Sequence, residues 1–118
     1  MSWTLRSTYE WAQHAVVARQ LGMTEGDLER VRRGPQDPAW SPFEAAVLAV
    51  TDGLLADGHV DDELWNVLAE RLDEAALMDL VFTVGGYATL AMLFNAADLP
   101  LDPDLDPADI ADFPDPPR

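Results

Sequence analysis

Two side chains near the start of the sequence, Glu10 and His14, have the types and the spacing that best suit chemistry. On a helix, residues four positions apart lie on one face, here with the carboxylate nearer the N-terminus. Such a carboxylate can hold one imidazole nitrogen and favour the protonated ring. His14 would then be a general acid and base, oriented by Glu10. The alternative is a helix pair without catalytic function, contributing roughly 0.2–0.5 kcal/mol to stability.

Four residues are candidates for binding a substrate beside this pair. Arg6 lies about one helical turn before Glu10 and would meet an anionic group on a small molecule. Tyr9 and Trp11 flank Glu10, and Tyr87 follows two adjacent glycines in a distant apolar segment. Aromatic residues of this kind more often belong to a core or to subunit contacts, so pocket lining is one of two interpretations.

The composition excludes several kinds of site. The chain has no cysteine, which excludes disulfides, thiolate metal sites and thiol redox catalysis within its 118 residues. His59 has Asp57, Asp61 and Asp62 close by in the sequence, but acids at the start of a helix usually form a solvated cap. We therefore predict no metal site and no cofactor.

The charge of the chain limits its partners. There are 22 acidic residues against 7 arginines and no lysine, giving a net charge of -15. Such a field repels phosphate backbones and anionic lipids, so we predict neither nucleic-acid nor membrane binding. No uninterrupted run of about 18 apolar residues and no signal-peptide core are seen, which predicts a cytoplasmic protein.

Apolar residues recur at spacings of three and four, which predicts an all-helical chain of about five helices. The expected helices are 3–21, 25–33, 42–57, a helix capped by Asp61 with apolar positions up to Leu72, and 74–97. Residues 1–97 would form a single domain. The last helix is so apolar that one small domain can hardly cover it, which predicts a partner subunit.

Gly85 and Gly86 fall inside that last helix, where each costs about 1 kcal/mol relative to alanine. Close approach of another helix would offset this cost, and we prefer that interpretation. The alternative is a break into two helices.

Residues 98–118 form an acidic segment with six prolines, which predicts an extended or disordered tail. Its apolar side chains could instead pin it to the surface of its own or a neighbouring subunit. These side chains are Leu99, Leu101, Ile110 and Phe113.

Three stretches resemble the carboxymuconolactone decarboxylase family, also called the alkyl hydroperoxidase D-like superfamily. They are Y-E-W-A-Q-H (9–14), A-R-Q-L-G-M-T (18–24) and L-M-D-L-V-F-T-V-G-G-Y (77–87). The resemblance covers residues 3 to about 102. It implies an all-helical bundle that forms a homo-oligomer, commonly a trimer or hexamer.

The resemblance also implies a family-level label of peroxiredoxin activity. Thiol peroxidases of the family carry a C-x-x-C-x-x-x-H helix; aligned on His14, the two cysteine positions hold Ser7 and Glu10. Because both sulfurs are missing, the thiol mechanism is ruled out for this chain.

The decarboxylase members lack the redox pair and act on lactone acids, for which a histidine proton donor or acceptor is suitable. They also have upstream helices that help to form the site, and we expect these to be missing here, either truly or through a misassigned start. Two hypotheses follow. The first is an acid/base enzyme for a small carboxylated or lactone substrate, using His14 with Glu10. The second is a truncated, catalytically silent helical oligomer that serves as a binding or scaffolding module.

Overall fold

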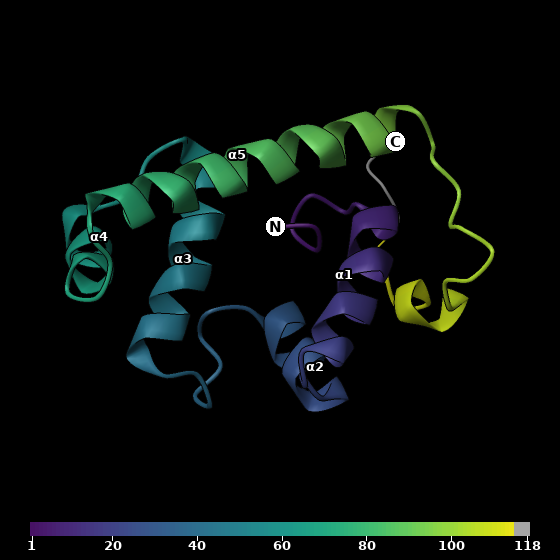
Figure 1. Ribbon diagram of the computed structural model, residues 1–118, viewed down its shortest axis with the longest axis horizontal. Coiled ribbons are helices and arrows are strands. Elements are labelled where there is room, and N and C mark those ends of the chain that lie inside the picture. Colours follow the sequence, from purple (N-terminus) through teal and green to yellow (C-terminus); the bar gives the residue numbers. More distant parts are fainter. Residues whose placement is uncertain (115–118) are drawn as a thin grey trace.

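The structure, a computed structural model, describes residues 1–114, and within them the chain consists of helices, turns and loops without a β-strand. This confirms the prediction of an all-helical chain with about five helices (Figure 1). The elements in chain order are α1 (Thr8–Gln20), α2 (Glu25–Arg33), α3 (Pro42–Asp57), α4 (Asp62–Ala69), α5 (Glu74–Ala96) and the short 3-10 helix η1 (Pro107–Ile110).

Local sequence determines the bounds of α2 and α3, which match the predicted ranges. Thr24 and Asp27 form a capping box at the start of α2, and Ser41 and Glu44 form one at the start of α3. In each box the two side chains satisfy backbone N–H groups that a helix start leaves without partners. Gly58 ends α3 in the left-handed conformation, with φ of 65°.

The first helix begins later than predicted, at Thr8 instead of Trp3. The preceding residues form turns, and Arg6 has a φ of 55°, which a continuing right-handed helix does not allow. These turns bring the Trp3 ring to 5.3 Å from the Trp11 ring, centroid to centroid. The start of the predicted helix is thus replaced by turns that pack Trp3 against Trp11.

Two separate apolar clusters stabilise opposite ends of the molecule, which is 42 Å long. The first joins α3, α4 and the start of α5 around Val50, Leu68 and Leu77. The second joins α1 and α2 around Trp11 and Leu28. Helix α5 runs along most of the length of the molecule and passes both clusters (Figure 1).

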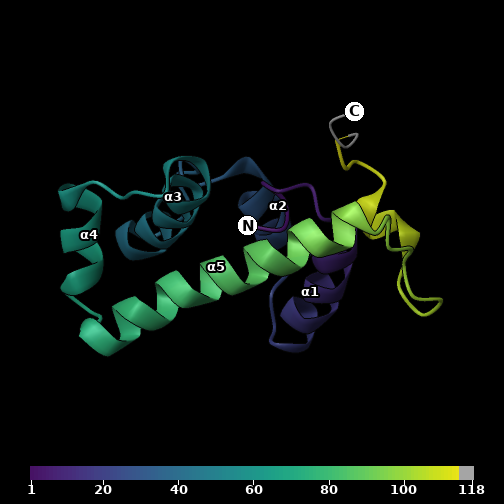
Figure 2. The ribbon, with the colours of Figure 1, turned by 90° about the horizontal axis from the view of Figure 1, so that it is seen from above.

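The outer face of α5 is apolar and uncovered. Seen from above in Figure 2, no other helix lies over it. Phe82 is 74% exposed, and Met78, Met92 and Leu93 are each exposed by more than half. By length and composition α5 could cross a membrane, and only 22% of its most apolar window is buried in this chain. Exposing such an apolar face to water is unfavourable. A contiguous exposed apolar patch of this kind is typical of an interaction surface.

The paired glycines do not interrupt α5, so the predicted alternative of a break into two helices is wrong. The preferred close approach is not made within residues 1–114 either. A Cβ atom added to Gly85 or Gly86 would have no neighbour within 4 Å.

Residues 98–114 follow a mostly irregular path in which η1 packs against α1. Ile110 and Phe113 join the second apolar cluster, with the Phe113 ring 4.5 Å from the Trp3 ring. Asp109 is buried and forms a two-pronged ion pair with Arg19 on α1. This part of the tail is therefore held on the surface of its own chain by its apolar side chains, as the second interpretation predicted. Residues 115–118 lie outside the described residues.

Candidate functional site

His14 and Glu10 are joined through the backbone and not through the carboxylate. The His14 Nδ1 atom lies 2.8 Å from the backbone carbonyl oxygen of Glu10. A histidine at position i can reach the carbonyl at i-4 on its own helix, as serine and threonine do. The predicted pairing of imidazole and carboxylate is replaced by this contact.

This contact decides which ring nitrogen of His14 carries the proton. A carbonyl oxygen can only accept a hydrogen bond, so Nδ1 must donate to it. In the neutral ring Nε2 is then left with a free lone pair. The contact also fixes the direction of the ring, which suits a proton acceptor at Nε2.

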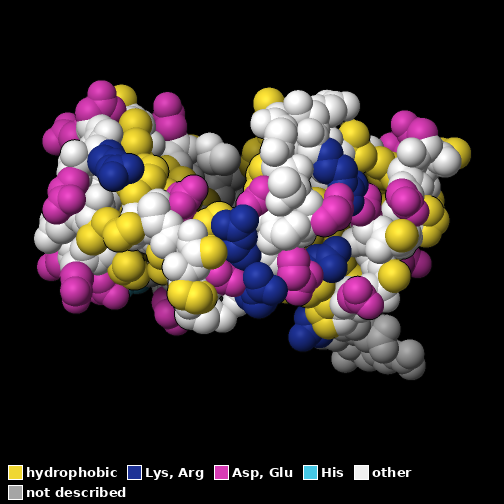
Figure 3. All heavy atoms as spheres, turned by 90° about the horizontal axis from the view of Figure 1, so that it is seen from below, with side chains coloured by type: hydrophobic (Ala, Val, Ile, Leu, Met, Phe, Trp, Pro, Cys, Tyr) yellow, Lys and Arg dark blue, Asp and Glu magenta, His cyan; other side chains and the backbone are white. Residues whose placement is uncertain are grey.

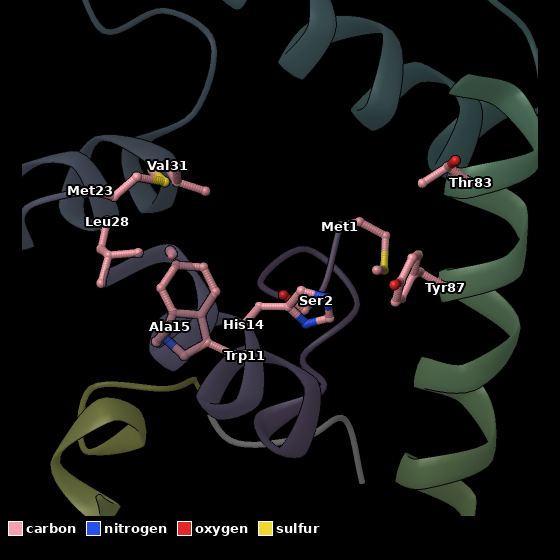
Figure 4. A pocket seen from close by; sticks show the side chains of 11 residues that line it. Met1, Ser2, Trp11, His14, Ala15, Met23, Leu28, Val31, Thr83 and Tyr87 are labelled. Carbon is pink, nitrogen blue, oxygen red and sulfur yellow. The ribbon is translucent and has the colours of Figure 1, made fainter. Parts of the chain in front are cut away.

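The His14 ring lines a cavity of about 380 Å³ between α1, α2 and α5. Figure 4 shows the ring pointing towards Tyr87 on α5, with Met1 and Ser2 of the N-terminal turn beside it. The two rings meet edge to face, with centroids 5.1 Å apart and planes at 79°. The cavity size falls in the range of small-molecule sites, roughly 300–1,000 Å³.

The cavity has an apolar part and a polar part. Trp11 from α1 and Leu28 and Val31 from α2 form apolar wall, and Met23 adds to it from the loop between the two helices. The polar groups gather at the other end, where α5 faces the N-terminal turn (Figure 4). They are His14, Ser2, Thr83 and Tyr87. A ligand would place its apolar body against α2 and a polar atom near His14.

Glu10 lies beneath this site as a buried acid. It is 2% exposed, and neither carboxyl oxygen has a hydrogen-bond partner. The hydroxyl of Ser7, also fully buried, makes no hydrogen bond of normal geometry. Burial raises the pKa of Glu10, while the charges of His14 and the N-terminus and the nearness of Ser7 lower it by less. Glu10 therefore favours its neutral form more than an exposed glutamate does.

Two of the predicted substrate-binding residues lie outside the cavity. Tyr9 donates a hydrogen bond of 2.8 Å to Asp102, which also accepts one from Gln13, and this bond raises the pKa of Tyr9. Tyr9 thus anchors the tail segment. Arg6 lines a separate small hollow with Asp98 at the end of α5. Trp11 and Tyr87, in contrast, both line the cavity with His14.

Sequence reasoning did not select Met23, Leu28, Val31 or Thr83 as cavity residues. Leu28 and Val31 were expected only as members of the helix 25–33, and Thr83 as a member of the helix 74–97. Only the packing of α2 and α5 on either side of α1 brings them together. No motif in the sequence marks that arrangement.

Within residues 1–114 no three histidine or acidic side chains gather closely enough to hold a metal ion. His59 is exposed in the loop between α3 and α4. A scan of family models, a search of characterised proteins and a search of solved structures each found no match for this chain. The family resemblance accordingly stays a prediction from the sequence motifs.

Proposed function

We propose that this chain is an acid/base enzyme for a small lactone or carboxylated substrate, similar to the carboxymuconolactone decarboxylase family, with His14 as the proton acceptor and donor. One observation carries the proposal: Nδ1 of His14 is held by the Glu10 carbonyl while the ring lines a cavity large enough for a small molecule. A fixed imidazole with a free nitrogen at a cavity is the arrangement that general base catalysis needs.

The other residues of the site have supporting functions in this proposal. Tyr87 and Thr83 carry the hydroxyl groups on α5 that a substrate oxygen would meet. Trp11 supplies an apolar surface for the substrate body. Glu10 acts on His14 through its backbone carbonyl oxygen, which accepts the hydrogen bond from Nδ1. It is a positioning residue because its carboxyl group does not line the cavity.

Reduction of hydroperoxides by a thiol is not part of the proposed function. That chemistry needs a thiolate nucleophile, and the chain has no cysteine. The family-level peroxiredoxin label therefore does not describe what these residues can do. Proton transfer at a lactone or next to a carbonyl needs only the imidazole and its neighbours.

The experiment that tests the proposal compares His14→Gln with His59→Gln on a panel of small lactones and lactone acids. The second variant is the matched control, because His59 is exposed and lies outside the cavity. We expect His14→Gln to lower kcat by at least about 100-fold, in line with removal of a general base, and His59→Gln to change it by less than about twofold. Equal turnover by wild type and His14→Gln, or no turnover of any compound by wild type, would refute the enzyme proposal.

A second candidate function is a catalytically silent binding or scaffolding module built as a homo-oligomer. The uncovered apolar face of α5 favours self-association, because 74% of Phe82 is exposed and Gly85 and Gly86 leave open space for a second helix. A trimer or hexamer would follow from the family resemblance. We propose the cytoplasm as its location. An oligomer that turns over none of the panel would support the silent module.

A further inference from the structure

The cavity at His14 has no arginine among its lining residues. This is notable because lysine is missing from the chain and only seven arginines are present. A site for a carboxylate normally supplies a guanidinium or ammonium group, since an unpaired charge is costly to bury. The positions of the arginines therefore bear on which substrate the cavity can take.

The arginines of the described residues are engaged elsewhere. Arg19 pairs with Asp109 and Glu25, Arg30 with Asp27, and Arg33 with Asp37. On the face seen from below in Figure 3, arginine side chains lie among acidic ones. None of these groups lines the His14 cavity.

Arg32 contacts Trp11 of the cavity wall, and it is also occupied. Its guanidinium lies 5.0 Å from the Trp3 ring and 5.1 Å from the Trp11 ring, where it makes cation–π contacts. It donates a hydrogen bond of 3.1 Å to the backbone of Asp109. Arg32 lines two other hollows and not the His14 cavity.

The remaining cations offer no better partner for an anion at His14. Arg71 lies over the Phe43 ring in the other apolar cluster, and Arg6 lines its own hollow with Asp98. Met1 lines the cavity, but burial lowers the pKa of its ammonium group, and the charges of Asp52 and Glu10 raise this pKa by less. With a net charge of -15, the field of the whole chain further disfavours an anionic ligand.

Building on the proposed function, we infer that the substrate of the His14 site is a neutral lactone with an apolar body, and not a lactone acid. The Trp11, Leu28 and Val31 wall takes the apolar body, and the lactone carbonyl lies at the polar end with Tyr87 and Thr83. Decarboxylation needs a carboxylate on the substrate, so the inference assigns ring opening to this site instead.

Ring opening by water balances with His14 as the only proton carrier. Nε2 takes a proton from a water molecule as the water oxygen bonds to the lactone carbonyl carbon. The ring C–O bond then breaks, and the imidazolium returns the proton to the departing ring oxygen. The product is a hydroxy acid, which ionises at neutral pH. The lack of an arginine in the cavity and the acidic surface then favour its release.

The test compares a neutral lactone with its own ring-opened form, which has nearly the same size. The probes are γ-phenyl-γ-butyrolactone and 4-hydroxy-4-phenylbutanoate, with binding followed by tryptophan fluorescence and by calorimetry. We expect the lactone to bind at least about tenfold more tightly than the acid, since no arginine lines the cavity to pair with the anion. Equal or tighter binding of the acid, or no saturable binding of the lactone up to millimolar concentration, would overturn the inference.

A variant that supplies a cation makes the test specific to the cavity. Thr83 is exposed on α5 and lines the cavity, so Thr83→Arg adds a guanidinium there without disturbing a core position. Thr89→Arg is the control on the same helix, since Thr89 is exposed and does not line the cavity. We expect Thr83→Arg to improve binding of the acid relative to the lactone by about tenfold, and Thr89→Arg to leave the ratio unchanged. An unchanged ratio in Thr83→Arg would contradict a cavity whose selectivity comes from its lack of an arginine.

This inference and the proposed function fail in different ways. If lactone acids bind better and are turned over in a manner that depends on His14, the neutral substrate is wrong and the acid/base site stands. If the neutral lactone binds selectively but His14→Gln turns it over as fast as wild type, the binding preference stands and the acid/base site is wrong.

Discussion

Replacing Glu10 by glutamine is expected to stabilise the protein at neutral pH. Glu10 is 2% exposed and neither of its carboxyl oxygens has a hydrogen-bond partner, so its ionised form carries a desolvation penalty. Glutamine keeps the shape and removes the charge. A buried polar group without partners costs about 1–3 kcal/mol, and more when charged. The folded protein can avoid the charge by keeping Glu10 protonated. At pH 7 this costs at most about 3.7 kcal/mol, the free energy that corresponds to the interval between pH 7 and the usual glutamate pKa of about 4.3.

The sign of the pH dependence follows from the raised pKa of Glu10. Below the pKa that Glu10 has in the unfolded chain, its carboxyl group is protonated in both the folded and the unfolded state. The folded state then has no cost from burying a charge. As the pH rises through the window up to the folded pKa, the unfolded state loses its proton first and the folded state is destabilised. We therefore expect Glu10→Gln to be about 1–3 kcal/mol more stable than wild type at pH 7.5, with little difference at pH 4.0.

Urea unfolding at the two pH values measures this difference. For a chain of this size the expected gain at pH 7.5 moves the urea midpoint up by roughly 0.5–2 M. Glu70→Gln is the control, because Glu70 is exposed and its replacement should stay within about 0.5 kcal/mol. A Glu10→Gln variant that is less stable than wild type at pH 7.5 would refute the reasoning, because it would show that the carboxylate has a favourable partner. An equal gain at both pH values would refute it as well.

Two further predictions concern the tail and α5. Asp109→Asn removes the charge that Arg19 holds, and because Arg19 is about a third exposed we expect a loss of only about 1–2 kcal/mol at pH 7. Arg19 lowers the pKa of Asp109, so this contribution is present above the unfolded value of about 3.9 and is lost as the pH falls through the folded pKa. The difference in melting temperature between wild type and Asp109→Asn should become smaller at pH 3. A difference that stays constant would indicate that the variant loses packing and not the ion pair. Phe82→Asp places a charge on the uncovered face of α5; we expect light scattering to show an oligomer for wild type and a smaller, still helical species for the variant. A compact wild-type monomer would contradict self-association through α5.

The sequence predicted best what depends on neighbouring residues. Thr24 and Ser41 mark helix starts because each meets its acid three positions later, and Gly58 marks an end because it needs a positive φ. These features need no knowledge of the rest of the chain. The bounds of α2 and α3 could therefore be predicted to the residue.

Long-range packing is what the sequence could not supply. The turns before α1 form because Trp3 packs on Trp11 and Phe113, and Phe113 comes from the far end of the chain. The tail was predicted to be extended or disordered from its composition, yet the buried Asp109 finds Arg19 on α1. Acidic, proline-rich composition does not reveal such a partner.

The site shows the same division. The spacing of Glu10 and His14 predicted that they interact, but not that the imidazole would choose the carbonyl oxygen over the carboxylate. Glu10 itself is buried, which the local sequence does not indicate. The place of Tyr87 beside His14 likewise depends on how α5 crosses α1, which no local pattern determines.

The protonation state of the His14 ring tests the proposed site most directly. A long-range proton–nitrogen correlation spectrum of the ¹⁵N-labelled protein, recorded where the imidazole is neutral, distinguishes the two tautomers. The chain has two histidines, so the spectrum of His14→Gln assigns the signals. We predict that Nδ1 carries the proton, since it donates to Glu10, and that the bare Nε2 signal shifts when γ-phenyl-γ-butyrolactone is added. A proton on Nε2, or an Nε2 signal that ignores the lactone, would contradict His14 as the base of this site.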